Sequence, residues 1–161
     1  MSLITNEDKR LREYLKKMMS ALEETRGRLG DMVLTPTYYA FDLYRPFKGA
    51  TPLKTTLQAP AFNTGDVELP TVQVSAARGA DGKLVLALVN LNPERPARVT
   101  TNLTSAVTGK VLTGAAMDAH NTFEQPQAVV PAPFSAKPGS QGLVLTLPAR
   151  SVVVVEMQAL R

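Results

Sequence analysis

The sequence predicts a mainly β protein, an antiparallel β-sandwich preceded by one or two α-helices. The stretch Lys83–Asn92 is short and apolar and contains the β-branched Val85 and Val89, and turn residues stand at both ends in Asp81-Gly82 and Asn92-Pro93. Such a run is typical of a strand that is buried on both faces. Further short strand-like segments follow from Thr51 onward at spacings typical of sandwiches. Before residue 51 the apolar residues recur at helical spacing instead.

The composition limits the chemistry that the chain can carry out. With 161 residues, 44% of them hydrophobic and 20% charged, the chain is long enough for one domain with a real core. The absence of cysteine excludes disulfides, thiolate zinc sites and cysteine nucleophiles. The net charge of +4 is scattered, so we expect no nucleic-acid partner. No apolar segment reaches the roughly 18 residues that span a membrane, and no leader is visible, so we expect a cytoplasmic location.

Residues 1–31 are predicted to form a first unit, with an amphipathic helix over 6–29. Thr5 and Asp8 resemble a capping box at its start. Apolar residues then recur at alternating spacings of four and three, with Thr25 in the one polar slot. This candidate interface consists of Leu11, Leu15, Met18, Leu22 and Leu29. Because an isolated helix this short is marginal in water, its stripe should bury against the domain, a second copy or a foreign partner.

Residues 32–50 are predicted to hold a second helix, from Pro36 to Tyr44. Thr35 is a favourable N-cap, and proline suits the first helical position. Tyr38, Phe41 and Tyr44 share one face. Aromatic rings at this spacing are far more often core than a surface on which a sugar or base stacks, although both interpretations remain open.

Residues 51–161 are predicted to form the sandwich. The expected strands are Leu53–Ala59, Thr71–Arg78, Lys83–Asn92, Ala97–Leu103, Thr108–Leu112, Leu143–Leu147 and Ser151–Gln158. Gly79–Gly82 should turn a hairpin between the second and third, and Pro148–Arg150 another between the last two. Val152–Val155 is an uninterrupted β-branched run, which predicts a central strand because an exposed one would invite aggregation.

Between Ala115 and Gly142 the periodicity disappears, and this predicted loop contains the only histidine of the chain. Asp118, His120 and Glu124 are residue types that ligate metals or transfer protons, and they lie close together in the sequence. They are therefore weak candidates for a site. No established catalytic or nucleotide-binding motif accompanies them, so we predict no catalytic residue, no metal and no cofactor.

The alternative interpretation of this loop is structural. Asp118 and Asn121, the fourth loop candidate, would then make turn hydrogen bonds to the backbone. Phe123 and Phe134 would anchor the loop against the domain. A long loop in a compact domain is usually either functional or held by its own side chains.

Four segments resemble the C-terminal region of the α-L-arabinofuranosidases of glycoside hydrolase family 51. They read M-V-L-T-P-T-Y-Y-A-F-D-L-Y (32–44), L-V-L-A-L-V-N-L-N-P (84–93), G-K-V-L-T-G-A-A-M-D-A-H-N-T-F-E-Q-P (109–126) and L-T-L-P-A-R-S-V-V-V-V-E (145–156). The resemblance covers residues 32–158. It implies that the helix at 35–44 closes a (β/α)₈ barrel and that the remainder forms a β-sandwich beside that barrel. Where the barrel is absent, we expect Tyr38, Phe41 and Tyr44 to be at least partly exposed and to make the chain associate.

The resemblance implies an accessory domain of an enzyme that acts on arabinose-containing polysaccharides or oligosaccharides. Retaining catalysis needs two carboxyl groups about 5–5.5 Å apart. In the family both lie on barrel strands upstream of the matched region, so no catalytic residue is carried over. The family's sandwich also takes in sequence from the enzyme's N-terminal end. The expected partner is therefore a barrel, in cis or in trans, or a second copy of the chain.

A second, weaker resemblance concerns residues 7–29, which are similar to the N-terminal docking helices of polyketide synthases. The matching segments are E-D-K-R-L-R-E-Y-L-K-K (7–17) and L-E-E-T-R-G-R-L (22–29). This resemblance implies a protein–protein docking module as the alternative function. By contrast, Ser2–Lys9 resembles the arabinofuranosidase connection that runs directly into Met32, which would make Arg10–Asp31 an insertion.

Overall fold

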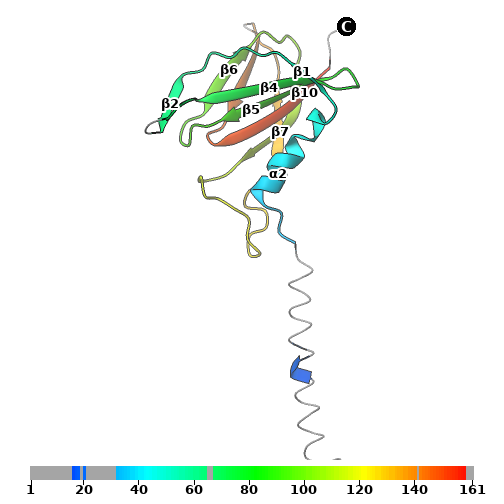
Figure 1. Cartoon of the computed structure of the whole chain (residues 1–161), viewed down its shortest axis with the longest axis vertical. Coiled ribbons are helices and arrows are strands. Elements are labelled where there is room, and N and C mark those ends of the chain that lie inside the picture. The colour runs from blue at the N-terminus through cyan, green and yellow to red at the C-terminus, as the bar shows by residue number, and fades with distance from the viewer. Residues whose placement is uncertain (1–15, 19, 21–31, 65–66, 141, 159–161) are drawn as a thin grey trace, which may run out of the picture. The chain divides into compact units, whose positions relative to one another are not determined.

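A computed structural model of the chain describes residues 16–18, 20, 32–64, 67–140 and 142–158 (Figure 1). The chain divides into two units, Met1–Val33 and Leu34–Arg161. In the first unit, residues 16–18 and 20 are helical, and Met18 is 43% exposed. The rest of the predicted seam, Leu11, Leu15, Leu22 and Leu29, lies outside the described residues. In the part of the chain that is described, no helix has the length and apolar character to cross a membrane.

The second unit confirms the predicted fold class, because it consists mostly of antiparallel strands with one short helix in front (Figure 1). Helix α2 (Pro36–Leu43) and the 3-10 turn η1 (Arg45–Phe47) come first. The strands are β1 (Thr51–Leu53), β2 (Ala61–Thr64), β3 (Val67–Pro70), β4 (Val72–Arg78), β5 (Leu84–Asn90), β6 (Ala97–Thr101), β7 (Val107–Thr113), β8 (Ala132–Ala136), β9 (Leu143–Leu147) and β10 (Ser151–Met157). A six-stranded sheet has the order β1-β4-β5-β10-β7-β8, and β2-β3 and β6-β9 form two-stranded sheets.

The six-stranded sheet is covered on both faces near its centre. Along β10, Val153, Val155 and Met157 belong to one hydrophobic cluster, which includes the fully buried leucines of β9. Val152 and Val154 belong to a second cluster, which includes Leu43 of α2. Because side chains alternate along a strand, consecutive valines fill cores on opposite sides of the sheet. The uninterrupted apolar run is therefore explained by burial on both faces.

The two strands that the sequence predicts as central are central. β10 lies between β5 and β7, and β5 lies between β4 and β10. The predicted hairpin between β4 and β5 is also confirmed. The amide of Gly79 donates to the carbonyl oxygen of Lys83 at 2.9 Å, and Gly82 adopts a φ of 81°, which favours glycine.

The second predicted hairpin was wrong. β9 pairs with β6, whereas β10 pairs with β5 and β7 in the other sheet. Pro148–Arg150 therefore carries the chain from one layer of the sandwich to the other. Both flanking strands are apolar, and that pattern alone does not reveal whether two neighbours in sequence pair or face each other across a core.

Strand prediction also failed around the prolines. Only Thr51–Leu53 pairs with β4, so the predicted strand Leu53–Ala59 is nearly absent. The hairpin β2-β3 was not predicted, and β8 lies inside the predicted loop. β1 and β8 are the two edges of the large sheet, and each contains a proline, Pro52 or Pro133. Proline is tolerated in an edge strand, because the backbone amides that face away from the sheet have no neighbouring strand to which they could donate a hydrogen bond.

Gly109 of β7 lies so close to β10 that even the methyl group of alanine is predicted to destabilise the fold. A methyl carbon added there would lie 2.7 Å from Cα of Val155 and closer still to the Val154 carbonyl oxygen, both on the neighbouring strand β10. We expect Gly109→Ala to lower the free energy of unfolding by about 1–3 kcal/mol, as measured by chemical denaturation. Gly139→Ala is the control, because an added methyl there meets nothing within 4 Å. Equal stability of the two variants would contradict the close approach.

Candidate functional site

Helix α2 begins where the sequence predicts. The Thr35 hydroxyl accepts a hydrogen bond from the Tyr38 amide at 3.2 Å, and Pro36 occupies the first turn. This cap satisfies one of the backbone donors that a helix start leaves open. The helix ends at Leu43, and Asp42 forms an exposed ion pair of 3.2 Å with Arg45 in the 3-10 turn that follows.

One face of α2 packs on the sheet. Leu43 is 5% exposed and contacts the cluster that contains Val85 of β5 and Val154 of β10. Tyr39 and Tyr44 are half-buried against the same cluster, and burial raises the pKa of the Tyr44 phenol. This contact fixes α2 on the large sheet.

The opposite face of α2 is exposed, so two of its three aromatic rings are not part of the core of this chain. The expectation that these rings are at least partly exposed in a chain without the barrel is confirmed. Tyr38 is 50% exposed and Phe41 is 75% exposed, whereas Tyr44 is half-buried. The helix carries aromatic or apolar residues on more than one face, and periodicity cannot say which of these faces meets the sheet. The loop that follows β7, drawn in yellow beside the start of α2, adds Met117 and Phe123, 72% and 66% exposed (Figure 1).

Asn121 ties this loop to the segment that enters α2. The Asn121 side chain is 8% exposed, and its Nδ2 donates to the Leu34 carbonyl at 2.7 Å and to the Val129 carbonyl at 3.0 Å. Its Oδ1 accepts from the Val129 amide at 2.7 Å. These bonds support the structural interpretation of the residue. Phe134 packs on the core as expected, but Phe123 is exposed and does not anchor the loop.

The other three loop candidates are not brought together. His120 is exposed, and its Nδ1 donates to the backbone oxygen of Asp118 at 2.8 Å. Hydrogen bonds from its own amide and from the Thr122 hydroxyl lower the pKa of the exposed Glu124 carboxyl. Across the described residues, no group of three or more histidine and carboxylate side chains could hold a metal ion. Asp118, His120 and Glu124 therefore do not form a cluster that could bind a metal ion.

Sequence reasoning missed a buried polar network at the crossing from β9 to β10. Asn90 is 1% exposed, and its Nδ2 donates to the carbonyl oxygens of Arg95 at 2.9 Å and Pro148 at 2.8 Å. Its Oδ1 accepts from the Asn92 amide at 3.0 Å. The sequence did contain a signal for this network, because Asn90 directly follows the apolar run Leu84–Val89 and a buried amide needs hydrogen-bond partners.

Arg150 completes this network from the other side of the crossing. Its Nε donates to the Gly114 carbonyl at 3.1 Å and its Nη2 to the Ala115 carbonyl at 3.0 Å, while its Nη1 contacts the Pro93 carbonyl. The residue adopts a positive φ of 50°, which is uncommon for a non-glycine side chain. Three carbonyl groups thus hold a strained turn residue in place.

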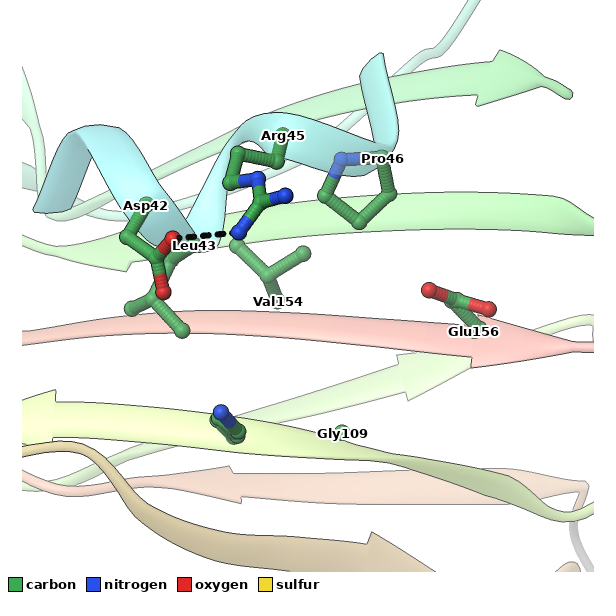
Figure 2. Close-up of a pocket in the computed structure, with 8 residues that line it drawn as sticks. Asp42, Leu43, Arg45, Pro46, Gly109, Val154 and Glu156 are labelled. Carbon is green, nitrogen blue, oxygen red and sulfur yellow. Dashed lines mark hydrogen bonds and ion pairs between the residues drawn. The ribbon is translucent and has the colours of Figure 1, made fainter. Parts of the chain in front are cut away.

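A pocket of about 290 Å³ lies where α2 and η1 pass over β7 and β10 (Figure 2). Asp42 and Arg45 form the ion pair described above on its helical side, and Glu156 lies on its sheet side. The Glu156 carboxylate is 3.6 Å from the Lys83 ammonium, which is also 3.0 Å from Asp81. Three of the four charged side chains that line this pocket, Asp42, Arg45 and Glu156, thus take part in ion pairs on an exposed surface, an arrangement that supplies little binding energy.

Asn121→Ala is predicted to loosen the loop and the start of α2 together. The change removes three hydrogen bonds and leaves buried backbone groups of Val129 unsatisfied, so unfolding should cost about 2–3 kcal/mol less. Thermal and chemical unfolding measure this loss. His120→Ala is the neighbouring control and should change stability by less than about 0.5 kcal/mol because its ring is exposed. A large loss at His120 with none at Asn121 would refute the assignment.

Residues 18–151 match the model of the alpha-L-arabinofuranosidase C-terminal domain family. The match begins earlier than residue 32, so part of the expected insertion Arg10–Asp31 falls within the matched range. An intracellular exo-alpha-L-arabinofuranosidase of Bacteroides ovatus is 34% identical over 134 residues, which make up 80% of this chain and 26% of that protein.

Solved structures agree with this match. The family 51 arabinofuranosidase of Xanthomonas axonopodis pv. citri has a TM-score of 0.71 at 40% identity, over 79% of this chain and 27% of that one. The thermostable family 51 enzyme of Thermotoga petrophila RKU-1 has a TM-score of 0.65 at 26% identity, over 78% and 29%. The chain thus spans about a quarter of the length of these relatives and corresponds to an accessory domain, not to the catalytic barrel. The chain belongs to the alpha-L-arabinofuranosidase C-terminal domain family.

Proposed function

We propose that this chain serves as the non-catalytic β-sandwich that supports the catalytic barrel of an α-L-arabinofuranosidase. The barrel belongs either to the same polypeptide or to a separate subunit. The observation that carries the proposal is the outward face of α2, where Tyr38 and Phe41 are 50% and 75% exposed.

Exposed aromatic rings on a helix that is already anchored favour a protein interface. Burial of apolar surface contributes about 25 cal/mol per Å², so two large rings left in water represent a substantial unused contribution to binding. Aromatic side chains are enriched at the centres of protein interfaces. The relatives are about four times as long as the matched segment, and the remainder of each enzyme could supply the opposing surface.

The edge of β6 supports the same proposal independently. Among the described strands, β6 pairs with β9 alone. A groove of about 800 Å³ runs between β6 and the extended segment before β2, with Leu57, Val72 and Val99 among its lining residues. An exposed strand edge over an apolar floor suits an added strand. We assign this groove to the N-terminal segment that the family's sandwich takes in.

In this proposal the chemistry resides in the barrel. Two barrel carboxyl groups perform retaining hydrolysis of an arabinofuranosyl bond in an arabinose-containing polysaccharide or oligosaccharide. The sandwich holds the barrel in its folded form and supplies no reacting group. The location follows that of the Bacteroides ovatus relative, described as intracellular, so we place the chain in the cytoplasm.

The proposal is tested with the complete chain and the Xanthomonas axonopodis enzyme from which the matching C-terminal domain has been removed. The chain alone should not hydrolyse an aryl arabinofuranoside, whereas the two polypeptides produced together should co-purify and hydrolyse it. Phe41→Ser should weaken this association about tenfold or more, because it removes an exposed aromatic anchor. Leu69→Ser is the control, since Leu69 is exposed on β3, outside α2 and the loop.

Two results would count against the proposal. The unsubstituted chain could fail to associate with the barrel, or Phe41→Ser and Leu69→Ser could weaken the association equally. Hydrolysis by the chain alone that disappears in Glu124→Gln would instead return the loop candidates to consideration. The unfolding midpoint of each variant shows whether a loss reflects the interface or the fold.

A further inference from the structure

A second apolar feature lies next to the start of α2. A pocket of about 270 Å³ opens between this helix and the loop that follows β7. Its floor contains Val89 of β5 and Val152 of β10, which lie opposite each other in adjacent strands and are both half-buried. Pro36 lines one side, and Met117, 72% exposed, lines the other.

Hydrogen bonds hold both walls of this pocket in place. The loop wall is fixed by Arg150, whose guanidinium donates to the carbonyl oxygens of Gly114 and Ala115. The helical wall is fixed by Asn121, which joins the loop to the carbonyl oxygen of Leu34, two residues before Pro36. The pocket is therefore formed before anything binds, and a preformed site loses less entropy on binding.

The pocket suits an apolar occupant rather than a sugar. Its lining is mainly apolar, and the polar side chains in the lining already donate to backbone carbonyl oxygens. These side chains are Asn90, Thr113, Arg150 and Ser151. A sugar hydroxyl buried here would lack sufficient partners, which costs free energy. The volume also lies below the roughly 300–1,000 Å³ of small-molecule sites.

We infer that this pocket receives an apolar side chain from the catalytic barrel and acts as an anchor point of the barrel–sandwich interface. The inference rests on the proposed function. Pro36 lines the pocket and opens the helix that exposes Tyr38 and Phe41, so the pocket continues the surface assigned to the barrel. The chain covers only 27% of the Xanthomonas enzyme, and the remaining part of that enzyme is long enough to supply the side chain.

The test fills the pocket from within. In Val89→Phe a ring replaces the half-buried valine and occupies the volume that the barrel side chain would take. The unfolding midpoint of the complete chain should stay equal or rise, because the new ring is buried among apolar groups. The dissociation constant for the truncated Xanthomonas barrel, measured by titration, should rise about tenfold or more.

Gln73→Phe is the matched control. Gln73 lies opposite Val89 on β4 and is exposed, but it is not among the residues that line the pocket. This variant adds the same ring one strand away and should bind the barrel as the unsubstituted chain does. Should Val89→Phe lower the unfolding midpoint, Met117→Ser replaces it, because the exposed Met117 contributes to the rim without supporting the core. It should weaken binding in the same direction.

Each outcome decides the matter. Normal binding by Val89→Phe with an intact fold, or by Met117→Ser where that variant is used, overturns the pocket inference and leaves the proposed function standing. No binding by the unsubstituted chain overturns both. A dimer of the chain alone that dissociates on Val89→Phe assigns the pocket to a second copy and also overturns the inference.

Discussion

The architecture depends on burying strand β10 from every side. Its residues Val152–Val155 form an uninterrupted β-branched run, so both faces and both edges of the strand must be kept from water. β5 and β7 occupy the two edges, the leucines of β9 cover one face, and Leu43 of α2 covers the other. The helix packed on the outside of the sandwich is therefore part of the core packing. It covers a second apolar face of the central strand, which would otherwise be left in water.

The segment that joins β9 to β10 depends on hydrogen bonds from polar side chains. The buried Asn90 donates a hydrogen bond to the Pro148 carbonyl in the crossing from β9, and Arg150, which lies in the crossing, donates to the carbonyls of Gly114 and Ala115 after β7. A buried amide such as that of Asn90 is tolerated only when its hydrogen-bond partners are complete. The same arginine also fixes the loop after β7, so the wall of the apolar pocket and the crossing between layers share one support. A half-buried side chain of the crossing thereby helps to shape an outer surface.

The sequence predicts the central strands well because a doubly buried strand is apolar at nearly every position, as Leu84–Val89 and Val152–Val155 are. It predicts the edges poorly. Pro133 interrupts the pattern of β8, yet an edge strand accepts a proline. It also cannot tell whether Pro148–Arg150 joins neighbours in one sheet or strands in two. For the candidate site, the sequence singles out the loop carboxylates because their residue types can ligate metals or transfer protons. The structure instead shows an exposed surface of aromatic rings on α2. Helical periodicity cannot say which of them, Phe41 or Tyr44, faces outward.

The two prolines at the borders of the large sheet have a consequence for the chain in a crowded solution. Pro52 and Pro133 each remove one amide donor from an outermost strand, so another molecule cannot continue the hydrogen-bonded ladder without a gap. Growth of a fibre by sideways addition of copies is hindered at both ends of this sheet. The large sheet can therefore lie beside a helix that exposes apolar rings while its own two edges resist pairing with another copy through the backbone.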